Sequence, residues 1–260
     1  MREASSFPPQ YQIDRAETLR NRERLDDNTN LLFWYRELYR EQFRDLANPE
    51  SLQILEVGSG VSPLRRLYPN VVTSDVLDLD YLDHVFDCHE IHRISALPEE
   101  NFDVITVTNV LHHLRSPLEF LNRAACKLKH GGKLIATEPY FSLISTPIFK
   151  YLHHESVDFS ITSPELQDVR GPLATANIAL PWLIFVKHPS WSDSLQAEFD
   201  SDKIVSRPFS SLTYMATGGI SRRLPIPALI YRPLFYLDLA LSRALPKVFA
   251  SFFTVTLTRR

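Results

Sequence analysis

The feature that most constrains the fold is a mostly apolar segment that runs directly into two closely spaced glycines. Residues 52–57 (LQILEV) are typical of a buried strand, and Gly58 and Gly60 follow at once. The whole chain contains only 7 glycines, where average usage would give about 18. Glycine is therefore not loop filler here. We expect this pair to form a tight turn that lets a ligand approach the backbone.

Further strand-like segments follow, and helical or loop segments separate them. They lie at residues 71–75 (VVTSD), 84–86 (HVF), 102–108 (FDVITVT) and 133–137 (KLIAT). Alternation of this kind indicates an α/β fold in which a parallel sheet carries helices on both faces. The segment 252–258 (FFTVTLT) is rich in β-branched and aromatic residues, so we expect it to rejoin the sheet as a further strand.

One connecting helix is marked by its terminal residues. Pro117 stands at the favoured first helical position, Ser116 and Glu119 are expected to form a capping box before it, and Gly131 is expected to close the C-terminal end. A short helix is also expected over residues 62–68, directly after the glycine pair.

Four regions are expected along the chain. Residues 1–50 form an N-terminal arm and helix, the arm being polar and partly disordered to about Asp27. Residues 51–139 contain the ligand-binding sheet core, residues 140–202 form a lid, and residues 203–260 complete the sheet. The last two regions carry 10 of the 18 prolines and many aromatic residues, which predicts irregular backbone around an apolar pocket.

Composition disfavours several classes of protein. The 28 basic and 31 acidic residues nearly balance, so the basic excess of a dedicated nucleic-acid binder is absent. Two cysteines, Cys88 and Cys126, fit a reducing compartment. The charged N-terminus lacks the apolar core of a signal peptide, and no apolar stretch approaches the roughly 20 residues of a membrane helix. We therefore expect a cytoplasmic protein without an integral membrane segment.

The loop after the first strand disfavours the common nucleotide cofactors. A dinucleotide fingerprint needs a third glycine where this chain has Pro63, and proline removes an N–H that would face a pyrophosphate. No GxxxxGK[ST] phosphate loop is present in the sequence. Instead, Asp75 follows Gly58 by 17 residues, close to the offset of about 20 at which an acidic residue binds ribose hydroxyls. With Glu56 beside the loop and Asp87 placed to accept from an adenine amine, the cationic nucleoside S-adenosylmethionine fits best.

Five segments resemble, in order and spacing, the motifs of the class I S-adenosylmethionine-dependent methyltransferases. They are EVGSG at 56–60, SD at 74–75, FDC at 86–88, FDVITVTNVLHHL at 102–114 and KHGGKLIATEP at 129–139. The resemblance is to the methyltransferase type 11 branch, which includes quinone-biosynthesis methyltransferases. It implies a Rossmann-like, doubly wound, mostly parallel seven-stranded sheet with one reversed strand at the edge, and an inserted lid region.

The resemblance also implies which residues bind the cofactor. Its motifs place the amino-acid part and the ribose beside the glycine loop and strand 71–75, the adenine beside residues 86–88, and the methionine moiety beside residue 109. The residues so assigned are Glu56, Gly58, Ser59, Gly60, Asp75, Val76, Asp87, Cys88 and Asn109. The chain departs from many members of the family at Ser62, where they carry a third glycine.

Three histidines are candidates for a general base. His113 follows the fourth strand segment, and His153 and His154 open the lid. Imidazole titrates near neutral pH and can take a proton from an acceptor hydroxyl. A surface or lid-packing role is an equally good interpretation for each of them. The HExH segment at residues 89–92 lacks the metalloprotease spacing, so no metal site is predicted.

These patterns together predict an enzyme, an S-adenosylmethionine-dependent methyltransferase acting on a small-molecule acceptor. The methylated group would be a hydroxyl or amine of a glycan, a lipid-linked molecule or a secondary metabolite. A non-catalytic cofactor-binding or scaffold protein of the same fold is the alternative, because intact glycines and acids do not establish turnover. Residues 225–253 are apolar with interspersed arginines, which leaves peripheral membrane contact open. The oligomeric state does not follow from the sequence.

Overall fold

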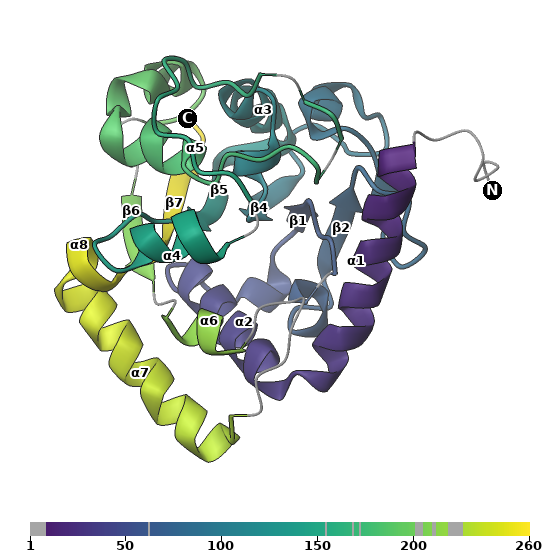
Figure 1. Cartoon of the computed structure of the whole chain (residues 1–260). Coiled ribbons are helices and arrows are strands. Elements are labelled where there is room, and N and C mark those ends of the chain that lie inside the picture. Colours follow the sequence, from purple (N-terminus) through teal and green to yellow (C-terminus); the bar gives the residue numbers. More distant parts are fainter. Residues whose placement is uncertain are drawn as a thin grey trace.

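The computed structural model describes residues 9–260, apart from residues 62, 154, 168, 172, 201–204, 210–211 and 218–225. Its centre is a seven-stranded sheet, which Figure 1 shows between helices on its two faces. The strands are β1 (Ile54–Val57), β2 (Val71–Asp75), β3 (His84–Val85), β4 (Phe102–Thr108), β5 (Leu128–Pro139), β6 (Val205–Phe209) and β7 (Phe252–Thr258). The predicted strands 71–75, 102–108 and 252–258 are confirmed with the same bounds.

The strand order is β3-β2-β1-β4-β5-β7-β6. The first five strands in this order pair in parallel, whereas β7 runs antiparallel to both β5 and β6. The predicted α/β, Rossmann-like, mostly parallel seven-stranded sheet is therefore confirmed. One detail was wrong, because the reversed strand is not at the edge: β6 pairs along its outer side and takes the edge position.

Helices cover the sheet, and most are short. Their bounds are α1 (Pro9–Asp27), α2 (Thr29–Gln42), α3 (Pro117–Ala124), α4 (Ser145–Leu152), α5 (Leu180–Trp182), α6 (Leu212–Thr217), α7 (Ala228–Ala244) and α8 (Pro246–Phe249). Alternate strand residues enter two separate cores, as the pleat requires. Leu55 and Ile105 pack in the core that contains α3, whereas Ile54 and Val104 pack in the core that contains α2 and Phe235 of α7.

The N-terminal segment was predicted wrongly as a partly disordered arm. From Pro9 it forms α1, which lies along the β2 side of the molecule in Figure 1. This helix is mostly polar, so it gave no hydrophobic periodicity in the sequence. Polar contacts hold it instead: Arg15 Nε donates to the Asp78 carbonyl at 2.6 Å, and the guanidinium of Arg22 lies 3.5 Å from the ring centroid of Tyr81.

The predicted ends of α3 also need correction. Ser116 makes no capping hydrogen bond through its side chain, and Glu119 instead pairs with Arg123 at 2.6 Å. Gly131 does not close this helix. It lies inside β5 with φ +76°, because the chain leaves α3 through a 3-10 turn and enters the strand earlier than expected. The short helix expected over residues 62–68 is a 3-10 turn at Leu64–Arg66.

Residues of the predicted lid region contact the loop that follows β4. The backbone N–H of Leu166 donates to the Arg115 carbonyl, and that of Asn177 donates to the His112 carbonyl. A small apolar cluster that includes Phe141, Phe149 and Ile178 holds the region together. Among the helices of the described chain, none is long and apolar enough to cross a membrane.

Candidate functional site

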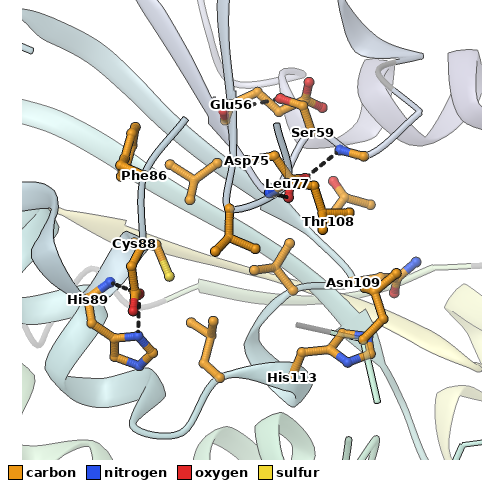
Figure 2. Close-up of a pocket in the computed structure, with 18 of the residues that line it drawn as sticks. Glu56, Ser59, Asp75, Leu77, Phe86, Cys88, His89, Thr108, Asn109 and His113 are labelled. Carbon is orange, nitrogen blue, oxygen red and sulfur yellow. Dashed lines mark hydrogen bonds and ion pairs between the residues drawn. The ribbon is translucent and has the colours of Figure 1, made fainter. Parts of the chain in front are cut away.

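A cavity of about 1050 Å³ opens at the carboxyl ends of β1, β2 and β4. Ligands bind at this edge in open α/β sheets. The lid contributes residues between Glu165 and Leu173 to its wall, and α1 contributes Thr18 and Asn21. All nine residues predicted to bind the cofactor line this cavity: Glu56, Gly58, Ser59, Gly60, Asp75, Val76, Asp87, Cys88 and Asn109. Figure 2 shows Phe86, Cys88 and His89 on one side of it and Asn109 and His113 on the other.

The glycine loop needs glycine at its first position for two reasons. Gly58 has φ +71°, which other residues adopt only with strain, and a Cβ there would lie 2.4 Å from Cγ2 of Val110. Gly60 has φ +51°, but a Cβ there would meet no atom within 4 Å. The loop is thus closed against the segment after β4 at Gly58 and open toward the cavity side at Gly60.

Asp75 stands at the end of β2 and is held by two backbone N–H groups. Gly60 N–H donates to Oδ2 at 2.9 Å, and Leu77 N–H donates to Oδ1 at 3.0 Å. Burial raises the pKa of this carboxyl, while the two backbone hydrogen bonds oppose the shift. These contacts fix the carboxylate in place, and each oxygen keeps a lone pair that can accept from a ligand hydroxyl.

Glu56 is the second buried acid of the cavity wall. Its Oε2 makes no hydrogen bond with the described part of the chain. Burial raises the pKa of Glu56 to about 8, with a further contribution from the charge of Asp75. The aromatic side chains of Tyr35 and Tyr39 line the cavity with it. A buried acid that lacks a partner is well suited to a cationic ligand, which would stabilise its charged form.

The third acid, Asp87, stands after β3 and before the 3-10 helix Cys88–Arg93. It accepts hydrogen bonds from the backbone N–H and from Nδ1 of His89, both within 2.9 Å, and these bonds to His89 lower its pKa. Burial raises the pKa of the Cys88 thiol, so this side chain has the character of a small apolar group and not of a nucleophile.

Asn109 follows β4 in a left-handed conformation, with φ +57°. Its backbone N–H donates to the Thr137 carbonyl at 2.9 Å, and its buried Oδ1 makes no hydrogen bond within the described residues. A non-glycine residue with positive φ beside a cavity is a form of local strain that is concentrated at functional sites. The side chain therefore presents an unsatisfied acceptor at the cavity wall.

Beyond Asn109 the cavity meets a cluster of ionisable side chains that includes His112 and His113. Glu138, at the end of β5, accepts from the backbone N–H groups of Val110 and Leu111 at 2.9 and 2.7 Å through Oε1. Its Oε2 accepts from Nδ1 of His112 at 2.5 Å. Glu138 thus fixes the backbone and the side chain of the loop after β4 at once.

Glu155 of the lid faces the same two histidines. Its Oε2 lies 3.5 Å from Nε2 of His112, and its Oε1 lies 3.4 Å from Nε2 of His113. Burial would lower the pKa of His112, but the charges of Glu138 and Glu155 outweigh it and raise the pKa to about 10. In turn, these histidines hold the pKa of Glu155 well below its usual range although burial opposes this.

The three predicted base candidates differ in position. His113 lines the cavity, and its Nδ1 lies 3.3 Å from the Thr175 carbonyl. His153 is not among the lining residues and has its Nδ1 3.7 Å from Oε2 of Glu155. His154 lies outside the described residues. Sequence reasoning missed Glu138 and Glu155, and the only signal was an acid at the end of the fifth strand segment and another beside the lid histidines.

The fold and the cavity define a class: a Rossmann-like enzyme domain with a nucleoside-binding edge that has glycines and acids in place of a phosphate loop. A sequence profile described as a methyltransferase domain matches residues 22–163, which is more than half of the chain. The chain belongs to this methyltransferase family. Its recognition as a class I S-adenosylmethionine-dependent methyltransferase is confirmed, and so is the cofactor.

Solved structures agree in fold. A Haloferax volcanii complex between the Trm112 methyltransferase activator and a candidate methyltransferase is 12% identical, covers 98% of this chain and 100% of that chain, and has a TM-score of 0.51. An S-adenosylmethionine-dependent methyltransferase from Archaeoglobus fulgidus is 15% identical, with coverages of 86% and 94% and a TM-score of 0.46. A third similar structure, the CurJ carbon methyltransferase, is 17% identical with a TM-score of 0.41; the match covers 83% of this chain and 50% of that one. No protein of curated function matches the sequence.

Proposed function

We propose that this enzyme transfers the methyl group of S-adenosylmethionine to a hydroxyl or amine of a small-molecule acceptor. The observation that carries the proposal is that one cavity joins the glycine loop and Asp75 to His113. A cofactor that fills the first part would leave the second part for an acceptor. The two reacting molecules would then meet inside one shared space, which is the arrangement that a direct transfer requires.

The cofactor pose follows from the acids. Asp75 accepts from the ribose hydroxyls while its backbone hydrogen bonds hold it rigid. Asp87 accepts from the adenine amine beside Phe86 and Cys88. At the other end, Glu56 balances the positive charge of the amino acid and sulfonium, and the free acceptor Oδ1 of Asn109 receives the ammonium group. Three acids and no phosphate-binding loop suit this cation better than any nucleotide.

The transfer itself needs alignment more than chemistry. The acceptor atom forms a bond to the methyl carbon, the carbon–sulfur bond breaks, and its electron pair stays on sulfur, which leaves as a neutral thioether. Close alignment supplies most of the rate, and exclusion of water by the lid helps because positive charge disperses in the transition state. We place the acceptor group beside His113, where its proton is lost.

A lipid-linked acceptor is favoured by one specific observation. The outward side of α7 exposes large apolar side chains, with Leu229 at 87% and Tyr236 at 52% exposure, and no acidic side chain of α7 is exposed. Arg232 is also exposed on this helix. Such a surface suits the interface of an anionic bilayer. Flotation with liposomes tests it: co-flotation that is lost when Leu229 and Leu237 become Ser supports a membrane-bound acceptor, and an equal recovery of both proteins in the pellet contradicts it.

Calorimetry with S-adenosylmethionine and detection of S-adenosylhomocysteine test the main proposal. Binding at micromolar to submillimolar concentration is expected, and product should form when a metabolite extract supplies acceptors. Binding without any product would favour the alternative of a non-catalytic cofactor-binding protein. If no binding occurs at millimolar cofactor, the proposal fails.

A further inference from the structure

The histidine cluster at the acceptor end has a geometry that a network of ion pairs does not require. The two Nε2 atoms and the carboxylate of Glu155 all lie within 4.8 Å of one another. The two nitrogen–oxygen distances are 3.5 Å for His112 and 3.4 Å for His113. Charge-assisted hydrogen bonds are shorter, at about 2.7–2.9 Å. Ligand atoms of a tetrahedral metal site with bonds of 2.0–2.2 Å stand about 3.3–3.6 Å apart.

Both imidazoles are also oriented as metal ligands usually are. A ligating histidine donates its other ring N–H to a carboxylate or to a backbone carbonyl, which fixes the tautomer and leaves the first nitrogen free to bind. Nδ1 of His112 lies 2.5 Å from Glu138, and Nδ1 of His113 lies 3.3 Å from the Thr175 carbonyl. Each ring therefore turns Nε2 toward the same carboxylate.

Charge balance points the same way. The carboxylates of Glu138 and Glu155 are both largely buried, with side-chain exposures of 2% and 17%. Two buried negative charges need two positive charges nearby. A single divalent cation supplies them and leaves both histidines neutral, as ligands must be.

We propose that His112, His113 and Glu155 bind one divalent transition-metal ion of the zinc type. Two nitrogens and one oxygen favour such an ion over magnesium, which prefers oxygen ligands alone. This inference rests on the proposed function for its role and deepens it. Three protein ligands leave a coordination position open, and His113 lines the cavity, so an acceptor hydroxyl can contact the ion there. The ion then makes that hydroxyl more acidic and so easier to methylate, and its proton passes to water.

A second group of possible ligands, Asp87, Cys88 and His89, lacks this arrangement. The Ser116 N–H donates to Nε2 of His89 at 3.3 Å, and Nδ1 of His89 pairs with Asp87 at 2.8 Å. Both ring nitrogens are therefore already engaged. His153 is excluded in a similar way, because its Nδ1 accepts from the Glu155 N–H at 3.2 Å.

The test measures metal binding alone, without cofactor or acceptor. Tag-free protein is stripped with a chelator, titrated with Zn²⁺ in competition with a chromophoric chelator, and analysed for metal content after dialysis. We expect one ion per chain, with affinity reduced more than 100-fold in His113→Ala and Glu155→Gln. Glu138→Gln, which changes only the hydrogen bond to His112, should cost about 10- to 100-fold. His130→Ala, at a surface histidine, is the matched control and should bind as the unchanged protein does.

Thermal melts of every variant show whether it is folded, and Glu155→Gln keeps the inference testable if another variant unfolds. Stoichiometric binding that survives Glu155→Gln and His113→Ala, or no binding at micromolar Zn²⁺, overturns the inference. Loss in His89→Ala alone would assign the ion to the other group and overturn it as well. Calorimetry with S-adenosylmethionine separates the two proposals, since the cofactor can bind when the metal does not, and the reverse.

Discussion

The cofactor end of the cavity comes from one continuous stretch of chain, whereas the histidine end is assembled from three. Residues 56–88 supply the glycine loop and all three acids of the cofactor end. The other end needs the loop after β4, Glu138 at the end of β5, and Glu155 from the lid. Local segments leave recognisable spacings in a sequence, and assembled clusters do not. The two ends should therefore also fail differently when mutated.

The largest effect is expected from His113→Ala. Loss of the group that activates the acceptor should lower kcat by about 10²- to 10⁴-fold. Affinity for S-adenosylmethionine should stay within about twofold, because His113 lies at the other end of the cavity. Steady-state kinetics with an identified acceptor, together with calorimetry, measure both quantities. An equal loss of cofactor affinity would show that the two ends are not separate; His130→Ala provides the control.

Asp75→Ala should show the reverse pattern. Removing a charged acceptor of ribose hydrogen bonds costs about 1.5–3 kcal/mol, which corresponds to a 10- to 150-fold weaker cofactor affinity. The fold should survive, since the lost carboxylate is itself costly to bury. Asp80→Ala, an exposed acid in the same loop, is the matched control for the alternative that another nearby acid binds the ribose. An unchanged affinity for Asp75→Ala would remove this residue from the site.

The same contrast explains how much the sequence could predict. The strands and the positions of Asp75 and Asp87 follow from apolar periodicity and motif spacing, and these residues do line the cavity. The link from Glu138 to His112 depends on strand pairing that sequence patterns do not specify. α1 escaped notice because polar and cation–π contacts, not an apolar stripe, hold it. The capping box failed because Glu119 found a stronger partner in Arg123.

Gly58→Ala tests the backbone of the cofactor end. A residue with a side chain at φ +71° costs about 1–3 kcal/mol, and the new Cβ would also press on Val110. We expect a lower unfolding free energy and weaker cofactor binding. Gly131→Ala is the matched control, because it has φ +76° and open space around it. Chemical denaturation should show that Gly131→Ala loses only the cost of strain. Equal losses in the two variants would contradict a close packing of the loop against Val110.

The smallest effect concerns a single proton on Glu56. Its pKa of about 8 lies above the ordinary value of 4.5, so the cofactor-free protein carries this carboxyl protonated at pH 7. A folded-state pKa that is raised stabilises the protein below the ordinary value, and this contribution is lost as the pH rises from about 4.5 to 8.

A bound cation should reverse that shift and expel the proton. Calorimetric titrations at pH 7 in two buffers of different ionisation enthalpy should therefore detect release of up to about one proton per S-adenosylmethionine bound. Glu56→Gln should release less by that amount, while protons contributed by the cofactor's own amine are common to both proteins and cancel in the difference. The same proton count in both proteins would mean that Glu56 does not sense the cofactor charge. The charge of the cofactor end would then rest on Asp75 and Asp87 alone.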